Sequence, residues 1–255
     1  MPPRPRLVAV DGPSASGKST VVARLARTQD WVPLAEAYDR TTPPIDLHFS
    51  SLPELARIER TLLEEEANRW TVARALLHRG WSVIADTGFL GPLTYTRGLV
   101  GEGLASPGLL SELAERAQRL ALRRRWGLPD LTVYLQVPER LRRERARLDR
   151  AHHPPDLYAR HEAVARREAF FYETEWPSID RSAVYLVPAA GPTDRIAARV
   201  AERVRRSLPR GTAARHLPRL LATLSVPPGA LLRGTATRSS ATVKKTTRPA
   251  HHPRR

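Results

Sequence analysis

Residues 12–19 have the sequence Gly-Pro-Ser-Ala-Ser-Gly-Lys-Ser, which satisfies the pattern G-x-x-x-x-G-K-[S/T]. An apolar run at residues 6–11 precedes this stretch, and a helical pattern at residues 18–27 follows it. The two glycines let the backbone curl so that successive N–H groups point inward at phosphate oxygens, and the helix adds the partial positive charge of its N-terminus. The stretch therefore predicts a phosphate-binding loop between a strand and a helix; an ordinary glycine turn that caps a helix is the alternative.

Two side chains of this loop have specific expected roles. Lys18 is expected to reach the β- and γ-phosphates of a nucleotide, and the Ser19 hydroxyl is expected to bind Mg²⁺. Lys18 is the only lysine before residue 244, in a chain whose other basic residues up to position 204 are all arginine. The residues expected to contact the nucleotide are Gly12, Pro13, Ser14, Ala15, Ser16, Gly17, Lys18, Ser19 and Thr20.

Around the loop, short apolar runs alternate with helical patterns. The strand-like runs are residues 6–11, 31–35, 81–86, 131–137 and 184–187. The helical patterns are residues 18–27, 53–78, 93–99, 109–125, 138–150, 156–174 and 193–207. Five short strands separated by helices predict an α/β fold with a mainly parallel five-stranded sheet.

Most of the positive charge lies at the C-terminal end of the chain. Lys and Arg number 42 against 26 Asp and Glu, a formal net charge of +16, but positions 205–255 hold twelve basic residues and no acidic one. Positions 1–204 therefore carry only about +4. The segment beyond them is rich in Pro, Gly, Ser, Thr and Ala, and its apolar pairs, such as Leu220-Leu221 and Leu231-Leu232, lack a sustained period. We predict a folded domain over residues 1–207 and a disordered basic tail over residues 208–255.

Composition excludes several other classes of protein. The chain has no cysteine, which excludes disulfides and cysteine-ligated metals. The double histidines at 152–153 and 251–252 lack partners at ligand spacing, so zinc binding is not expected there. No stretch approaches about 18 uninterrupted apolar residues, and residues 1–6 lack the apolar core of a signal peptide. A cytoplasmic protein without a membrane partner is expected, and a homodimer is left open.

Two families of kinases resemble this sequence. Residues 8–20 resemble the phosphate-binding loop of nucleoside monophosphate kinases, and the Asp-Gly-Pro at residues 11–13 is similar to that of cytidylate kinases. Farther along, residues 66–69 (Glu-Ala-Asn-Arg), 79–80 (Arg-Gly), 83–86 (Val-Ile-Ala-Asp) and 129–135 (Pro-Asp-Leu-Thr-Val-Tyr-Leu) are similar to successive motifs of thymidylate kinases. The resemblance covers about residues 5–205.

This resemblance implies a three-layer α/β/α P-loop NTPase fold with ATP and Mg²⁺ as cofactors. It also implies a lid at about residues 138–156 and transfer of the γ-phosphoryl group to a nucleoside monophosphate or a nucleoside. The sequence departs from thymidylate kinases at two points. Their Asp-Arg-Tyr is here Asp86-Thr87-Gly88, and their Arg-Glu-Pro is reduced to Ala35-Glu36-Ala37. An alternative acceptor is therefore a non-nucleotide alcohol such as an antibiotic. A third hypothesis is nucleotide-dependent nucleic-acid binding, in which the basic tail contacts the polyanion.

Two carboxylates are candidates for the chemistry of phosphoryl transfer. Asp86 follows a predicted strand and is expected to anchor Mg²⁺ or orient the acceptor, although it also fits a loop cap. Glu36 is the candidate base for an acceptor hydroxyl, as in deoxynucleoside kinases, and a solvated loop carboxylate is the alternative.

Several arginines are candidates for contacts with phosphate or acceptor. Arg69 is expected to project from the long helix toward the acceptor, unless it pairs with Glu65 or Glu66 at the surface. Tyr95 and Arg97 are expected to stack on the acceptor and pair with it, or else to pack the loop.

The lid candidate contains six arginines between residues 140 and 150, which cannot all face one phosphate. Arg143, Arg147 and Arg150 share a helical face and are the three we select. Arg143 and Arg147 are assigned to catalysis and Arg150 to the substrate; a solvated helix is the alternative.

Overall fold

Strand β1 (Leu7–Asp11) lies at the centre of a five-stranded sheet, between β3 (Val83–Asp86) and β4 (Leu131–Gln136). The edge strands are β2 (Val32–Leu34) and β5 (Val184–Pro188), and the order is β2-β3-β1-β4-β5, with all neighbours parallel. The computed structural model describes residues 5–43, 45–150, 153–206 and 216–228. The predicted α/β class and parallel sheet are confirmed.

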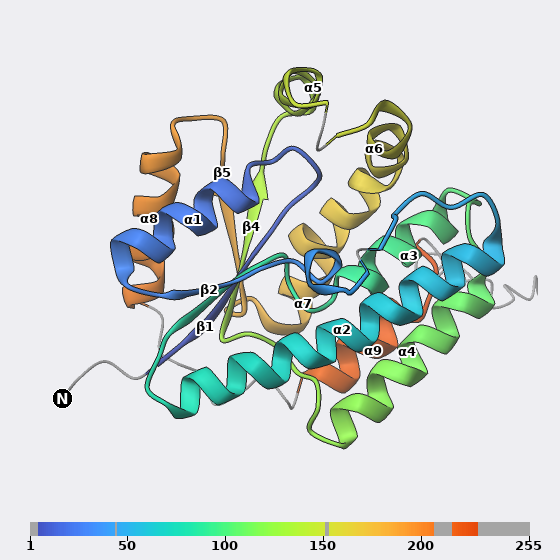
Figure 1. Ribbon diagram of the computed structural model, residues 1–255, viewed down its shortest axis with the longest axis horizontal. Helices are drawn as coiled ribbons and strands as arrows, with labels where there is room; N and C mark the ends of the chain where they lie inside the picture. Colours follow the sequence, from blue (N-terminus) through green and yellow to red (C-terminus); the bar gives the residue numbers. More distant parts are fainter. Residues whose placement is uncertain (1–4, 44, 151–152, 207–215, 229–255) are drawn as a thin grey trace, which may run out of the picture.

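Helices cover both faces of this sheet (Figure 1). They are α1 (Lys18–Gln29), α2 (Leu52–His78), α3 (Gly91–Gly101), α4 (Pro107–Leu122), α5 (Glu139–Leu148), α6 (Pro155–Phe170), α7 (Trp176–Asp180), α8 (Thr193–Arg206) and α9 (Leu217–Leu224), with a 3₁₀ turn η1 (Tyr38–Arg40) and a π turn η2 (Phe171–Glu175). Helices α1 and α8 lie on one face, and α2, α3, α4, α7 and α9 lie on the other (Figure 1). The arrangement is the expected three-layer α/β/α fold.

The two faces of β1 divide the core into two clusters. Leu7 and Ala9 belong to the cluster under α2, α3 and α4, whereas Val8 and Val10 pack with α1 and α8. Successive side chains of a strand point to opposite faces, so a run that is apolar throughout fills both layers. All five residues of β1 are buried. The carboxyl end of β1 therefore opens into the phosphate-binding loop from a fixed position.

Local signals explain most element boundaries. The Ser51 side chain accepts a hydrogen bond from the backbone N–H of Glu54 and caps α2, and Ser106 caps α4 in the same way at Leu109. The long pattern predicted as one helix over residues 156–174 is α6 followed directly by η2, and α7 continues from there. None of the helices among the described residues is long and apolar enough to cross a membrane.

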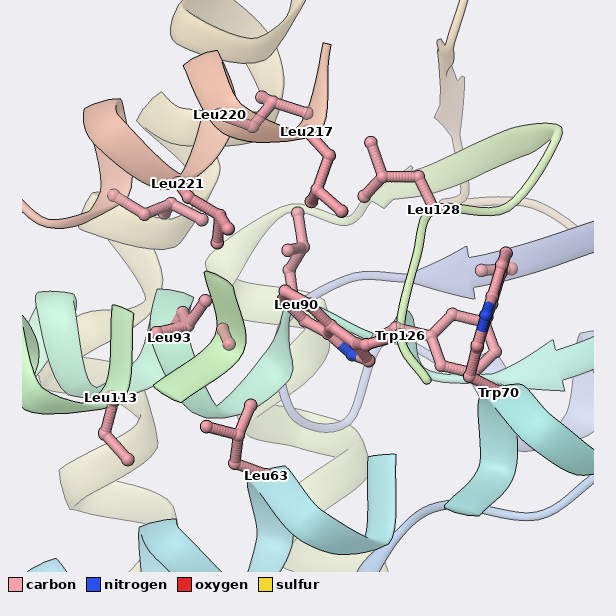
Figure 2. Packing of buried hydrophobic residues seen from close by; sticks show 14 of the residues in the cluster. Leu63, Trp70, Leu90, Leu93, Leu113, Trp126, Leu128, Leu217, Leu220 and Leu221 are labelled. Atoms are coloured by element: carbon pink, nitrogen blue, oxygen red, sulfur yellow. The ribbon is translucent and has the colours of Figure 1, made fainter. Parts of the chain in front are cut away.

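Helix α9 corrects the prediction for the C-terminal segment. We predicted disorder from residue 208, and this is wrong for residues 217–224, which form a helix. The leucines at 217, 220, 221 and 224 are spaced i, i+3, i+4, i+7, so they form one apolar stripe, which the search for apolar pairs overlooked. All four are buried in the cluster under α3 and α4, and Figure 2 shows Leu217 and Leu221 pointing toward Leu90 and Leu93. Residues 208–215 and 229–255 of the predicted tail lie outside the described residues.

Candidate active site

The phosphate-binding loop occupies the turn between β1 and α1. Gly12 and Gly17 have φ angles of 150° and 89°, in the region that favours glycine. A Cβ atom at Gly12 would also lie 2.9 Å from the Ser16 hydroxyl and 3.1 Å from the Leu135 carbonyl oxygen, which is closer than side chains normally pack. The Lys18 ammonium donates a hydrogen bond to the Gly12 carbonyl at 3.2 Å. The predicted loop therefore has the curled backbone that its chemistry requires, and Lys18 folds back over it.

A cavity of about 900 Å³ lies beside this loop. Residues 14–20 of the loop line one part of it, and α2, α6 and the start of α3 line the rest. Ligands of parallel α/β sheets bind at the carboxyl ends of the strands, which is where this cavity lies. Its volume is typical of a pocket for a drug-sized ligand.

Asp86 and Ser19 meet at the edge of the loop. The Ser19 hydroxyl lies beside the Asp86 carboxylate and lowers its pKa, but burial and the negative charge of Glu36 outweigh this and raise that pKa to about 6. The Oδ1 atom of Asp86 is buried and has no hydrogen-bond partner in the described part of the chain. A hydroxyl and an unpartnered carboxylate oxygen are ligands that suit Mg²⁺, which usually completes its shell with phosphate and water. No cluster of three acidic or histidine side chains suited to a metal occurs among the described residues.

Glu36 follows β2 and lines the cavity. Its Oε1 atom accepts a hydrogen bond of 2.6 Å from the Thr87 hydroxyl. Thr87 has a φ angle of 62°, an uncommon conformation for a β-branched residue. Gly88, next in the chain, lies so close to the Asp11 carboxylate that a Cβ atom would overlap with it. Residues 86–88, where thymidylate kinases have Asp-Arg-Tyr, therefore have another role here: Thr87 orients Glu36, and Gly88 leaves space for the Asp11 carboxylate.

Arg69 lies outside the cavity. Its side chain is 0% exposed, and it donates hydrogen bonds to Glu66 at 2.5 Å and to the Asp86 carbonyl at 2.7 Å. The guanidinium therefore fixes the end of β3, which carries Asp86, and it does not reach the space where an acceptor would bind. The expected pairing with Glu66 occurs, but in the core and not at the surface.

Tyr95 and Arg97 point in different directions from α3. Tyr95 lines the cavity, and its ring packs edge-on against His161 at 5.2 Å. Arg97 is 2% exposed and donates two hydrogen bonds, of 2.5 and 2.8 Å, to Glu175, and one of 2.8 Å to the Val226 carbonyl. Arg97 therefore joins α3 to η2 and to the segment after α9, and it does not contact the cavity.

The arginine that reaches the loop from α5 is Arg145. Its Nη1 atom donates a hydrogen bond of 2.9 Å to the Ser16 carbonyl. From the segment after α5, the His153 Nδ1 atom lies 3.2 Å from the Ser14 hydroxyl. Arg143, by contrast, pairs with Glu139 on an outer face that also carries Arg147. Arg150 is exposed and does not line the cavity.

The structure therefore does not bring the three selected lid arginines to the loop. Helical spacing shows which arginines share a face but not which face turns inward, and that choice is fixed by the buried contacts of Arg142 and Ala146. Arg142 forms an ion pair with Glu162 of α6 at 2.8 Å.

Replacing Arg145 by alanine is expected to raise the KM for ATP about tenfold, because a charge-assisted contact near the phosphates is lost. Steady-state kinetics with varied ATP measure this. Arg143→Ala is the matched control, because Arg143 lies on the same helix two residues before Arg145, and the variant is expected to behave as wild type. Equal KM values for the two variants would contradict the assignment of Arg145 to the loop.

Sequence reasoning missed three carboxylates deep in the cavity: Asp11, Glu59 and Glu168. A sequence signal exists for Glu59 only: it is spaced i, i+7 from Glu66 on α2, beside the apolar stripe of that helix. Burial raises the pKa of Glu59 to about 8 and those of Glu66 and Glu168 to about 7, and it also raises the pKa of Asp11. In His161, which lines the same region, burial and nearby Lys18 lower the pKa to about 4, so its imidazole is neutral at neutral pH.

The Glu59→Gln variant is expected to lose less stability than wild type when the pH rises. Because the pKa of Glu59 is about 8 in the folded protein and 4.5 ordinarily, the folded state holds an additional proton between these values, and the free energy of unfolding falls as pH rises through them. Urea unfolding at pH 5 and pH 8 measures the difference. Glu115→Gln, at an exposed position of α4, is the control. A pH dependence of Glu59→Gln equal to that of wild type would contradict the assignment.

Comparisons with known proteins place this site in a family. Residues 7–174 match the family model described as the AAA domain, and no curated protein matches the sequence. Among solved structures, deoxyadenosine kinase from M. mycoides with bound dCTP is similar with a TM-score of 0.55 and 14% identity, over 78% of this chain and 98% of that one. Thymidylate kinase from Candida albicans is similar with a TM-score of 0.59 and 16% identity, over 79% and 92%.

These identities show a shared fold. The family match covers more than half of the chain, and its residues include the phosphate-binding loop, β3 with Asp86, and α5 with Arg145. The chain therefore belongs to the AAA domain family, and it has the fold of P-loop nucleoside and nucleotide kinases.

Proposed function

We propose that the protein is an ATP- and Mg²⁺-dependent phosphotransferase that moves the γ-phosphoryl group to a hydroxyl of a small molecule. One observation carries the proposal: Lys18, the pair of Ser19 with Asp86, and Glu36 converge at one end of a cavity of about 900 Å³. Phosphoryl transfer needs phosphate donors, a metal anchor and a group that orients the acceptor, and these residues supply all three. The fold shared with deoxyadenosine kinase and thymidylate kinase supports the same chemistry.

Each residue has a defined part in the transfer. The loop N–H groups and Lys18 hold the phosphates, and Arg145 adds positive charge from α5. Ser19 and Asp86 would hold Mg²⁺, which would supply positive charge to the phosphate oxygens. The acceptor oxygen forms a bond to the γ-phosphorus as the bond from phosphorus to the leaving ADP oxygen breaks, and the hydroxyl proton passes to Glu36. The products are ADP and a phosphate monoester.

The arginines narrow the class of acceptor. A nucleoside monophosphate needs a cation to bind its own phosphate. Of the three arginines expected at the acceptor, Arg69 and Arg97 have their guanidinium groups in buried pairs outside the cavity, and Arg150 is exposed and does not line it. A nucleoside or a non-nucleotide alcohol such as an antibiotic needs no such cation. We therefore favour an uncharged hydroxyl group on a molecule without phosphate.

An assay of ADP release tests the proposed function. The panel contains nucleosides, nucleoside monophosphates and hydroxylated antibiotics, each added to the full chain with ATP and Mg²⁺. We expect turnover that depends on an acceptor and exceeds the background hydrolysis of ATP. No stimulation by any acceptor, together with equal rates for wild type and Lys18→Ala, would refute the proposal.

Replacing Asp86 by asparagine is expected to weaken the dependence on Mg²⁺. The substitution keeps the shape of the side chain but removes the charge that holds the cation, so the Mg²⁺ concentration for half-maximal rate should rise about tenfold. Rates measured over a Mg²⁺ titration at fixed ATP give this value. Asp194→Asn, at an exposed residue of α8, is the control. An unchanged Mg²⁺ dependence in Asp86→Asn would remove Asp86 from the metal site.

A further inference from the structure

The cavity is lined mainly by acidic residues, in contrast to the basic composition of the chain as a whole. The chain carries a formal net charge of +16, yet eight Asp and Glu residues line the cavity. Among the described residues that line it, the lysines and arginines are Lys18 and Arg145, and both lie at the phosphate-binding loop. The rest of the described lining therefore holds carboxyl groups and no lysine or arginine, which is the reverse of what an anionic acceptor requires.

Three of these carboxyl groups come from separate elements: Asp11 from β1, Glu59 from α2 and Glu168 from α6. Glu168 raises the pKa of Glu59, and Asp11 raises the pKa of Glu168, so the three groups lie within electrostatic range along the cavity, and we call this part its deep end. Glu59 is 2% exposed, and its Oε2 atom has no hydrogen-bond partner within the described residues. Asp11 is 5% exposed, and its Oδ2 atom is likewise without one. Hydroxyl groups lie beside all three side chains: Tyr172 beside Asp11, Thr96 beside Glu59 and Thr94 beside Glu168. A hydroxyl does not replace the opposite charge of an ion pair, so burial of these carboxyl groups costs free energy.

Nearby arginines do not neutralise these groups. Arg69, Arg97 and Arg142 all lie in the surrounding helices, and each forms its ion pair with a different glutamate, Glu66, Glu175 or Glu162. The described residues contain no ion pair to Asp11, Glu59 or Glu168. Lys18 at the phosphate-binding loop lowers the pKa of Asp11 and of Glu168 without forming an ion pair with either. A bound ammonium group would therefore supply the first direct ion pair of the deep end within the described residues.

Uncharged groups of the cavity also suit a cation. The rings of Tyr95, Tyr134 and Tyr172 line it, and Tyr134 stacks on Tyr172 at 4.7 Å. Aromatic faces attract cations, and the effect grows when water is excluded. His161, neutral at neutral pH, offers a nitrogen and adds no positive charge to repel a cation.

We propose that the acceptor is an amine-bearing alcohol, such as an amino sugar or an aminocyclitol, whose ammonium group binds the carboxylates Asp11, Glu59 and Glu168. This inference rests on the proposed phosphotransferase function, which it deepens by naming the substrate class. An ammonium group anchored at the deep end leaves a hydroxyl of the same molecule for the phosphate end. The chemical step is the one proposed above: the hydroxyl oxygen gains the phosphoryl group, ADP leaves, and the hydroxyl proton goes to Glu36.

Binding is tested first, by titration calorimetry on the full chain with a non-hydrolysable ATP analogue and Mg²⁺. The probe is neamine, a two-ring aminoglycoside, and the neutral two-ring comparison is maltose; thymidine and dTMP represent a neutral nucleoside and an anion. We expect neamine to bind at least about tenfold more tightly than the other three, because charge-assisted hydrogen bonds are the stronger ones. Equal or tighter binding of maltose, thymidine or dTMP would overturn the inference.

Variants then test the carboxylates. Glu59→Gln and Glu168→Gln keep the shape of each side chain and are expected to reduce the preference for neamine over maltose about tenfold. Glu115→Gln, exposed on α4, removes the same charge from the surface and is expected to leave the preference unchanged. Thermal unfolding identifies a variant that fails to fold. If one of the two cavity variants does so, the other is used for the binding measurement. A preference retained in a folded cavity variant, or lost equally in Glu115→Gln, would overturn the inference.

Measuring ADP release with the same compounds separates this inference from the proposed function. Selective binding of neamine without acceptor-stimulated turnover would support the ammonium site and contradict the phosphotransferase proposal. Turnover of thymidine or dTMP without binding of neamine would do the reverse. Phosphorylated neamine, identified by mass spectrometry, would support both.

Discussion

Replacing Lys18 by alanine is expected to lower acceptor-stimulated phosphoryl transfer by about two to three orders of magnitude, the usual effect of removing one preorganised electrostatic donor. Lys18 and Arg145 are the lysine and arginine among the described residues of the cavity, and Lys18 lies on the loop itself. In the structure its ammonium group donates a hydrogen bond to the Gly12 carbonyl, a contact that a bound phosphate can replace. The loss of activity should therefore not be accompanied by unfolding.

Two measurements separate a loss of catalysis from a loss of structure. The turnover number at saturating ATP and acceptor reports on catalysis, and the thermal unfolding midpoint reports on the fold. Arg147→Ala is the matched control, since this exposed arginine on the outer face of α5 makes no contact with the phosphate-binding loop. Wild-type turnover in Lys18→Ala would mean that the loop does not serve phosphoryl transfer.

Removing residues 207–255 is expected to destabilise the protein severely, whereas removing residues 229–255 should leave the stability close to that of the full chain. The longer deletion removes α9 and with it four buried leucines. Each buried leucine contributes about 1.5–3 kcal/mol, so the sum is comparable to the whole unfolding free energy of about 5–15 kcal/mol of a typical domain. Arg97 also loses the Val226 carbonyl as an acceptor.

Urea unfolding of the two truncated chains measures this difference. The shorter deletion is the control, because it removes basic residues and leaves α9 in place. The same deletion tests nucleic-acid binding by the tail separately from folding. If the tail binds nucleic acid, the full chain should show an affinity that falls steeply with salt, and the chain without residues 229–255 should not bind. Equal unfolding midpoints for the two truncated chains would mean that α9 does not support the core.

The sequence predicted best where neighbouring residues determine the structure. The glycine spacing of residues 12–17 and the apolar run before it depend on local backbone geometry, so the loop, the parallel sheet and the place of Lys18 followed from the pattern alone. Arg69 and Arg97 could not be assigned in this way. Their partners, Asp86, Glu175 and Val226, lie far away in the chain, and only the packed structure shows that the guanidinium groups turn from the cavity.

The same limit applied to the carboxylates of the cavity. Asp11, Glu59 and Glu168 lie in three elements spread over most of the chain, and no local spacing links them. The leucines of α9 are a different case, since their helical spacing was present in the sequence and was overlooked because the surrounding composition indicated disorder.

The position of α9 affects how the chain folds while it is being synthesised. Residues up to 206 contain all five strands of the described sheet and the whole phosphate-binding loop. The apolar surface of α3 and α4 stays open until residues 217–224 emerge from the ribosome. Because α3 also carries Tyr95 of the cavity, one helix of the acceptor side gains its full packing only after α9 has been made. A nascent chain halted before this helix would expose leucine-rich surface, and such surface makes intermediates prone to aggregation.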